Sequence, residues 1–153
     1  VARPRDPKLG VVGEVTQVNP GLISGLIDQG YVPVVAPLAR GEDGRPYNLN
    51  ADTAAGALAE ALGAKKLVYL TDVEGLYRDL GDRDSLIQRI TVEGLRDLVG
   101  SGSVSKGMLP KLDSCISALE SGVHRVHILD GRVQHALLLE VFTPEGIGTM
   151  VMP

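Results

Sequence analysis

The sequence predicts an α/β fold in which helices cover both faces of a mainly parallel sheet. Strand-like runs alternate with helix-like runs along the chain, the order that is typical of such folds. The run KLVYLTDV, residues 66–73, is apolar on both alternating faces, as in a strand that is buried on both sides. No internal repeat or low-complexity segment interrupts this order. We therefore expect a single domain spanning residues 1–153.

Composition narrows the class of protein. The 153 residues are enough for one sizeable core, and 44% hydrophobic with 22% charged residues is typical of an ordered globular chain. The net charge of −4 argues against nucleic acid as a partner. No apolar run has the length of a membrane span, and no signal peptide opens the sequence. We expect neither nucleic-acid nor membrane binding.

Two further features concern the origin of the chain. Cys115 is the single cysteine, so no intrachain disulfide can form, which favours a cytoplasmic location. The sequence starts with Val1 and a stretch rich in proline and charge. We interpret this start as an exposed loop in a piece of a longer protein.

Helices are predicted from apolar spacing together with start and stop signals. Asn19 and Pro20 are typical of a helix start, Thr91 is a good N-cap, and glycines close several runs. The helix after residue 50 carries apolar positions at the spacing of one buried face. The expected helices cover residues 20–29, 51–62, 92–99, 108–120 and 133–142 and end, where a glycine marks the stop, at Gly30, Gly63 and Gly122.

Strands are predicted between these helices. YVPVVAPL, residues 31–38, is expected to form a buried strand whose Pro33 places it toward a sheet edge or at the strand start. GEDGRP, residues 41–46, is expected to form a hairpin-like turn. Further strands are expected at residues 66–72, 86–90, 125–129 and 148–151, after a short alternating run at 11–18.

Two polar clusters lie at or near the carboxyl ends of predicted strands, where ligands bind in α/β sheets. In NLNAD, Asn48 and Asn50 are two apart on an extended segment and so point the same way, with Asp52 close by. Their amides suit a small polar substrate. They could equally be turn residues that bond their own backbone, and Asp52 could equally cap a helix.

The segments LTDVEGLY and SKGMLPKLD have similar double interpretations. Asp72 suits the hydroxyls of a ribose, or belongs to an ordinary turn. Gly107 allows a ligand close to the backbone, and Lys111 in a first helical turn suits a phosphate. Lys106 and Lys111 could also be solvated charges. Neither GxxxxGK[ST] nor a strand-linked GxGxxG is present, so a bound nucleotide would be held in another way.

The histidines and the cysteine give little reason to expect a metal or a nucleophile. His124 and His127 face opposite sides of a predicted strand, and no cysteine pair accompanies them. Cys115 lies on a predicted helix without a base in sequence reach and is expected to be a buried structural thiol. We predict no metal-ligating residues.

Three blocks of the sequence resemble the acetylglutamate kinases of the amino acid kinase family. The blocks run YNLNADTAAGALAEALGAKKLVYLTDVEGLY, then SKGMLPKLDSCISAL, then GRVQHALLLEVFTPEGIGTMV. The likeness extends from Leu9 to the end, with the blocks in order and properly spaced. It implies the amino acid kinase fold and phosphorylation of N-acetyl-L-glutamate by ATP with Mg²⁺ in arginine biosynthesis.

The resemblance also implies roles for single residues. Asn48 matches the asparagine that binds the substrate, with Asn50 beside it, and Asp52 matches the aspartate that organises the catalytic lysines. Lys111 matches the lysine that stabilises the transferring phosphoryl group. The segments around adenine and ribose correspond to Thr71, Asp72, Gly75, Tyr77, Gly107 and Met108.

The chemistry of the residues agrees with this resemblance. The acceptor carboxylate is already ionised at neutral pH, so no general base is needed. Catalysis then consists of alignment plus positive charge from lysine, Mg²⁺ and helix N-termini. The family's N-terminal half carries further glycine-rich loops, a second catalytic lysine and a substrate-binding arginine, and none of these segments is present in this sequence. We therefore expect a C-terminal, nucleotide-binding half that is inactive alone.

The last block resembles the members of the family that arginine inhibits. His127, Glu140 and Gly146 match positions that line their arginine site, although each could also be structural: His127 in a strand core, Glu140 on a helix surface. The resemblance implies feedback inhibition by L-arginine. It also implies a homo-oligomer, a ring-shaped hexamer in inhibited members.

Two other functions remain open. One is a related kinase that acts on a carrier-protein-bound aminoadipate or glutamate, against which the arginine-site residues argue. The other is a non-catalytic module that binds arginine or nucleotide. Because the sheet of the parent would be divided, we also expect exposed strand edges and self-association.

Overall fold

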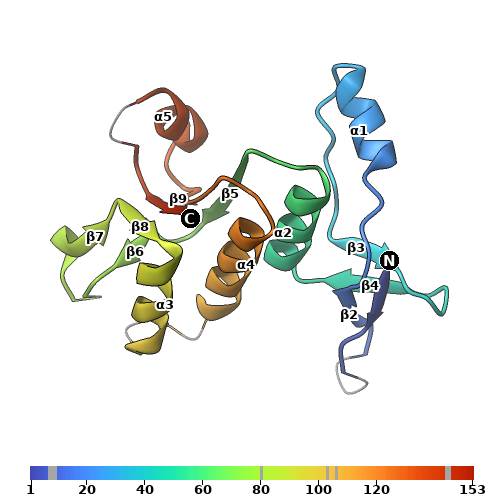
Figure 1. Cartoon of the computed structure of the whole chain (residues 1–153), viewed down its shortest axis with the longest axis horizontal. Coiled ribbons are helices and arrows are strands. Elements are labelled where there is room, and N and C mark those ends of the chain that lie inside the picture. Colours follow the sequence, from blue (N-terminus) through green and yellow to red (C-terminus); the bar gives the residue numbers. More distant parts are fainter. Residues whose placement is uncertain (7–9, 80, 103, 106, 144–145) are drawn as a thin grey trace. The chain divides into compact units, whose positions relative to one another are not determined.

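In a computed structural model of the chain, the described residues are 1–6, 10–79, 81–102, 104–105, 107–143 and 146–153. Lys106 lies outside them. The chain forms two compact units, Val1–Gly63 and Ala64–Pro153, which we call unit 1 and unit 2. Each unit has its own four-stranded sheet (Figure 1).

Unit 1 is a small mixed sheet with two helices. Its strands lie in the order β1-β2-β4-β3, with β2 and β4 parallel and the outer pairs antiparallel. The elements are β1 (Ala2–Pro4), β2 (Val12–Val15), α1 (Gly21–Asp28), β3 (Leu38–Arg40), β4 (Pro46–Leu49) and α2 (Ala51–Ala61).

The core of unit 1 lies on one face of this sheet. Ala2, Tyr47 and Leu49 are buried there, and Val15, Ala39 and Ala54 pack against them. Buried and exposed residues alternate along β4, so Asn48 points to the opposite face. β4 therefore packs into the core through Tyr47 and Leu49, and Asn48 lies on the face away from the core.

The predicted turn at residues 41–46 is confirmed. It joins β3 to β4 as an antiparallel hairpin. Asp43 holds it: the Arg45 backbone N–H donates to Oδ1 at 3.0 Å, and the Tyr47 hydroxyl donates to Oδ2 at 2.8 Å. These bonds, the backbone bond first, lower the pKa of Asp43, and the carboxylate in turn raises the pKa of Tyr47.

The predicted buried strand at residues 31–38 is wrong. Only Leu38 enters a strand, β3, and residues 31–37 form no ladder. Val32 is 89% exposed and Val34 is 96% exposed. The β-branched pattern favours a strand, but in the described part of the chain no neighbouring strand pairs with it, and a strand without a ladder is not stable.

Several helix boundaries follow the predicted signals, although α1 begins at Gly21 with Pro20 as its N-cap and α5 begins at Ala136 rather than at Val133. The Thr53 backbone N–H donates to Asn50 Oδ1 at 3.0 Å at the start of α2, and the Gly94 N–H donates to Thr91 Oγ1 at 3.2 Å at the start of α3. Past the ends of α1 and α2, Gly30 and Gly63 have φ of 83° and 59°, in the left-handed region where glycine is favoured. Local chemistry alone sets these boundaries.

Unit 2 surrounds a second mixed sheet in the order β5-β9-β10-β8. β5 pairs with β9 and β10 with β8 in parallel, and β9 pairs with β10 antiparallel. The elements are β5 (Lys66–Thr71), β6 (Leu76–Tyr77), a 3₁₀ turn (Arg83–Ser85), β7 (Leu86–Ile87), β8 (Arg89–Thr91), α3 (Val92–Gly100), α4 (Leu109–Glu120), β9 (Arg125–Asp130), α5 (Ala136–Phe142) and β10 (Thr149–Met152).

The α/β class is confirmed, while both four-stranded sheets are mixed rather than mainly parallel. In unit 2 the helices lie on both faces: α3 and α4 on one side and α5 on the other (Figure 1). The strand buried on both faces is β9, in which residues 126–130 are all buried. β5 was expected in that role, but it alternates, and Leu70 is 52% exposed.

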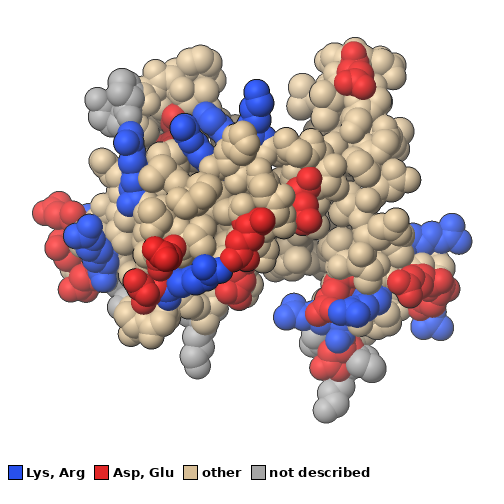
Figure 2. Space-filling model, in the orientation of Figure 1, with Lys and Arg blue, Asp and Glu red and all other residues tan. Residues whose placement is uncertain are grey.

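Among the described residues, no helix is both long and apolar enough to cross a membrane. On the face of unit 2 that Figure 2 shows, basic and acidic side chains are intermingled. That face therefore presents no large field of a single sign.

Candidate functional site

The carboxyl ends of β5 and β9 meet at one edge of the sheet in unit 2. The parallel register aligns Thr71 with Asp130. Directly beyond the strands, the Gly131 N–H donates to the Thr71 carbonyl oxygen at 2.8 Å. Two polar segments that are far apart in the sequence, residues 71–77 and 130–132, are thereby brought side by side. This edge is where ligands bind in open α/β sheets.

Asp130 and Arg132 form a fixed ion pair at this edge. Arg132 Nε donates to Asp130 Oδ1 at 2.9 Å and Arg132 Nη2 to Oδ2 at 2.8 Å, a bidentate pair, while the Arg132 backbone N–H also donates to Oδ1. The Asp130 side chain is 9% exposed and that of Arg132 66% exposed. A buried carboxylate therefore holds a guanidinium that faces solvent.

Charges around this pair shift its pKa values. The side-chain hydrogen bonds from Arg132 lower the pKa of Asp130, and the backbone bond adds to this. The pKa of Arg132 is raised first by Asp130 and, more weakly, by the charges of Asp72 and Glu74. Arg132 thus lies within electrostatic reach of the predicted ribose-binding aspartate.

The segment of residues 71–77 carries four predicted nucleotide-binding residues. Thr71 Oγ1 donates to Asp72 Oδ1 at 3.3 Å, and the Tyr77 hydroxyl donates to Glu74 Oε2 in a short hydrogen bond that raises the pKa of the phenol. At Gly75 a Cβ atom would lie 2.6 Å from Thr149 Oγ1, so only glycine allows this approach. The segment therefore packs against Thr149, the first residue of β10.

The start of α4 places Lys111 toward the same edge. A short turn joins α4 to β9, and the two have similar lengths, so the helix start lies near the strand's carboxyl end. Gly107 precedes the helix, Met108 is its N-cap and Pro110 lies in its first turn. Lys111 Nζ is 4.8 Å from the centroid of the Tyr69 ring, a cation–π contact that fixes the ammonium over β5.

His127, Glu140 and Gly146 come together between β9 and α5. His127 Nδ1 and Glu140 Oε1 are 2.6 Å apart, with side chains 7% and 9% exposed. The Ile147 N–H donates to Glu140 Oε2 at 2.9 Å. Gly146 has φ of 64°, and a Cβ there would lie 2.7 Å from Glu140 Oε2. The structure brings all three predicted arginine-site residues to one place.

This cluster is unusual because α5 points its carboxylate inward. Leu138, Val141 and Phe142 on the same helix are more than half exposed. The side chain of Glu140, in contrast, is only 9% exposed. His127 Nε2 is also buried and has no hydrogen-bond partner among the described residues. A buried carboxylate beside an imidazole nitrogen without a partner suits a ligand that brings hydrogen-bond donors.

Asn48, Asn50 and Asp52 lie in unit 1. Asn48 and Asn50 are both exposed and lie two apart at the end of β4. Asn50 caps α2 through its side-chain oxygen, which also accepts from the Thr53 hydroxyl at 3.3 Å. Asp52 lies in the first turn of α2, where a carboxylate interacts favourably with the helix dipole. The cap is thus Asn50, and any ligand contact of Asn50 would use its amide nitrogen.

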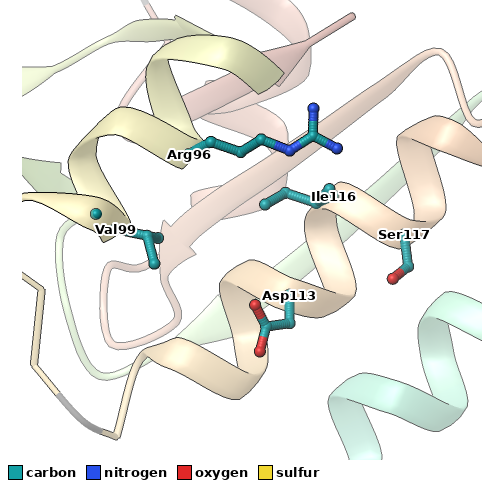
Figure 3. A pocket seen from close by; sticks show the side chains of 6 residues that line it. Arg96, Val99, Asp113, Ile116 and Ser117 are labelled. Atoms are coloured by element: carbon teal, nitrogen blue, oxygen red, sulfur yellow. The ribbon is translucent and has the colours of Figure 1, made fainter.

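A cavity of about 510 Å³ lies between α3 and α4, lined by Arg96, Val99, Gly100, Asp113, Ile116 and Ser117 (Figure 3). None of the predicted site residues lines it. Arg96, one of the residues that line the cavity, also forms an ion pair with Glu120, which links α3 to α4. Among the described residues, no group of three His, Cys, Asp or Glu side chains is placed to hold a metal ion. Cys115 is buried, as expected.

Sequence reasoning missed Asp130, Arg132 and Thr149. Asp130 could have been found by the signal that identified Asp72, since both follow an apolar strand directly. Thr149 gives no such signal because its partners, Leu76 and Ile87, are distant in the sequence.

A two-unit α/β chain with polar residues at the carboxyl ends of parallel strands is the kind of fold that binds nucleotides or small metabolites. A sequence profile described as "Amino acid kinase family" matches residues 2–130. The chain belongs to the amino acid kinase family.

Relatives within this family include acetylglutamate kinases. The chain is 56% identical over 143 residues to the acetylglutamate kinase of Caldanaerobacter subterraneus subsp. tengcongensis, with 94% of this chain and 48% of the relative covered. It is 54% identical over 147 residues to that of Synechococcus sp. strain RCC307, covering 96% of this chain and 50% of the relative. The chain thus spans about half the length of the curated relatives it matches.

Solved structures agree with the fold. N-acetylglutamate synthase from Neisseria gonorrhoeae, complexed with coenzyme A and L-arginine, matches with a TM-score of 0.87 at 31% identity over 99% of this chain and 35% of that chain. Carbamate kinase from Giardia lamblia matches with a TM-score of 0.68 at 20% identity, covering 99% of this chain and 51% of that chain, and supports the fold alone.

The Asp130–Arg132 pair predicts a pH-dependent contribution to stability. A pKa that is lower in the folded chain stabilises the fold above the carboxyl's unfolded value of about 4 and loses this effect as pH falls through the folded pKa. Asp130→Asn should therefore be less stable than the parent at pH 7, and the difference should shrink at pH 3. Urea unfolding at both values, followed by circular dichroism, measures this, and a difference that does not change with pH contradicts it.

Proposed function

We propose that the complete protein is an acetylglutamate kinase, which transfers the γ-phosphoryl group of ATP to the side-chain carboxylate of N-acetyl-L-glutamate in arginine biosynthesis. The observation that carries this proposal is the 56% identity to an acetylglutamate kinase across 94% of the chain. The location we expect is the cytoplasm. We also expect a homo-oligomer, a hexamer if arginine inhibits the protein.

In this function the edge formed by β5 and β9 holds the nucleotide. Asp72 accepts hydrogen bonds from the ribose hydroxyls, and Thr71, Gly75, Tyr77, Gly107 and Met108 surround the adenosine. Arg132 lies beside Asp72 and Glu74, so it offsets their negative charge where an anionic ligand approaches.

The reaction needs no general base. A carboxylate oxygen of acetylglutamate attacks the γ-phosphorus, the bond from that phosphorus to the β–γ bridging oxygen breaks, and ADP leaves with the electron pair. The product is an acyl phosphate. Both reactants are anionic, so rate enhancement depends on alignment and on positive charge. Mg²⁺ accompanies the phosphates of ATP, the way this ion usually enters kinase sites.

Lys111 is the positively charged group that this chain contributes to the transferring phosphoryl group. Its position over Tyr69 at the start of α4 restricts the ammonium before a substrate arrives. Asn48 binds the acceptor, with the amide nitrogen of Asn50 beside it, and Asp52 orients the lysines. The remaining positive charge would come from the half of the relatives that this chain does not cover.

L-arginine would bind at His127, Glu140 and Gly146. The buried Glu140 carboxylate suits a guanidinium or an α-ammonium group, and the unpartnered Nε2 of His127 suits a ligand hydrogen bond. The 31%-identical synthase from Neisseria gonorrhoeae was solved with L-arginine, which supports L-arginine as the kind of ligand.

The nucleotide site is tested by Asp72→Asn. Loss of one charge-assisted hydrogen bond costs about 1.5–3 kcal/mol, so the Kd for Mg-ATP should rise about tenfold or more. Isothermal calorimetry of the complete protein measures the Kd, with Asp97→Asn on the exposed face of α3 as the matched control. An unchanged Kd in Asp72→Asn contradicts the assignment.

The regulatory site is tested separately by Glu140→Gln. The neutral amide keeps the shape and removes the charge, so the concentration of L-arginine that half-inhibits the kinase should rise about tenfold or more. The KM for acetylglutamate should stay within about twofold, since the residue lies outside the acceptor site. Glu93→Gln, an exposed residue of α3, is the control. Equal inhibition of all three proteins would exclude Glu140 from arginine binding.

A further inference from the structure

Thr149 joins three elements through one hydroxyl group. It is the first residue of β10 and is fully buried. Its Oγ1 donates to the Ile87 carbonyl oxygen of β7 at 2.7 Å and accepts from the Leu76 N–H of β6 at 2.8 Å. Both backbone groups would be without these partners if the hydroxyl were removed, which is costly in a buried place.

The segment of residues 72–77 rests directly on Thr149. At Gly75 a Cβ atom would lie 2.6 Å from Thr149 Oγ1 and 3.2 Å from the Thr149 backbone nitrogen. Gly75 and Leu76 are therefore held by β10 in addition to the pairing of Leu76 with Ile87 between β6 and β7. Asp72 and Tyr77 lie on either side of this contact along the chain, so a movement of Thr149 would act on the segment between them.

Thr149 is itself fixed by the centre of the sheet. It pairs with Ile128 of β9, and at Gly148 a Cβ atom would lie only 2.2 Å from the Ile128 carbonyl oxygen. Backbone therefore packs against backbone at this point, with no side chain between that could absorb a movement. A displacement of residues 146–148 must reach Thr149, because packed interiors transmit strain.

The same short segment begins at the cluster of His127 and Glu140. The Ile147 N–H donates to Glu140 Oε2, and Gly146 lies against the same carboxylate. Four consecutive residues, 146–149, thus run from Glu140 to the backbone of Gly75 and Leu76. A cationic ligand that binds Glu140 would share this carboxylate with the Ile147 N–H and so act directly on the start of this segment.

We propose that Thr149 is a positioning residue for the nucleotide segment of residues 72–77, and that residues 146–149 carry the effect of a ligand at Glu140 to that segment. The inference rests on the proposed function, which assigns residues 72–77 to ATP and Glu140 to arginine. It adds a route inside one chain, from the regulatory residues to the nucleotide.

The test uses the complete natural protein and compares Thr149→Val, which removes the hydroxyl at constant shape, with Thr149→Ser, which keeps it. Val151→Ala is the matched control: Val151 is fully buried on the same strand, two residues on, and loses packing without touching Leu76 or Ile87. Thr149→Cys weakens both hydrogen bonds more mildly and replaces Thr149→Val if that variant does not fold. The KM for ATP is measured with and without L-arginine.

Thr149→Val should raise the KM for ATP about tenfold, because the hydrogen bond that holds Leu76 in the segment and the bond to the neighbouring Ile87 are both lost. In this variant the ratio between the KM for ATP with L-arginine and the KM without it should fall toward one. Thr149→Ser should keep both values within about threefold, and Val151→Ala should lower the melting temperature without either change. This split separates a positioning role from a merely structural one.

Three outcomes would overturn the proposal. If Thr149→Val behaves like Val151→Ala, the hydroxyl only stabilises the fold. If the KM for ATP rises but the ratio with and without L-arginine is unchanged, residues 146–149 do not connect the two sites. If the wild type neither uses ATP nor responds to arginine, the proposed function itself fails, and this inference falls with it.

Discussion

The parallel ladder between β5 and β9 runs from Lys66 beside Arg125 to Thr71 beside Asp130, and this register brings the polar segments at the ends of the two strands together. Because side chains alternate along a strand, Ile128 faces α4 together with Tyr69, while His127 faces α5 and meets Glu140. At the end of the ladder the same register puts Arg132 near Asp72. A shift by one residue would turn His127 away from Glu140 and separate the two polar segments.

Two carboxylates of unit 2, Asp130 and Glu140, have side chains that are largely shielded from solvent, and their surroundings differ. Asp130 and Glu140 are buried carboxylates, and each is held by groups from its own neighbourhood: Arg132 in one case, His127 and the Ile147 N–H in the other. Buried charges without such partners would be strongly unfavourable. Asp130 is fully engaged and serves to fix Arg132. Glu140 sits beside a histidine nitrogen without a partner, so it retains capacity for a ligand.

Local signals in the sequence determined much of this structure, and non-local ones did not. The N-caps Asn50 and Thr91 and the glycines after α1 and α2 act within a few residues, so the helix boundaries could be predicted from sequence alone. Residues 31–37 carry a strand pattern, but forming a strand depends on a neighbour that the pattern does not name. Likewise, burial alternates along β5 because α4 covers one face of this strand, and the sequence pattern alone did not indicate which face would be covered.

The candidate site shows the same division. Asp72 could be predicted because it follows a strand, and His127, Glu140 and Gly146 because their pattern as a set resembles a family. Arg132 requires the pairing of β5 with β9, and Thr149 requires contacts across more than sixty residues of chain, to Ile87 and Leu76. Such contacts are properties of the sheet topology, which the one-dimensional pattern does not contain.

Amide hydrogen exchange of the complete natural protein, with and without Mg-ATP, tests the central claim most directly. If the edge formed by β5 and β9 holds the nucleotide, protection should increase at residues 71–77 and 130–132 and at the start of α4, because a bound ligand suppresses local opening. Protection confined to other regions, such as the walls of the cavity between α3 and α4, with no change at residues 71–77, would contradict this account.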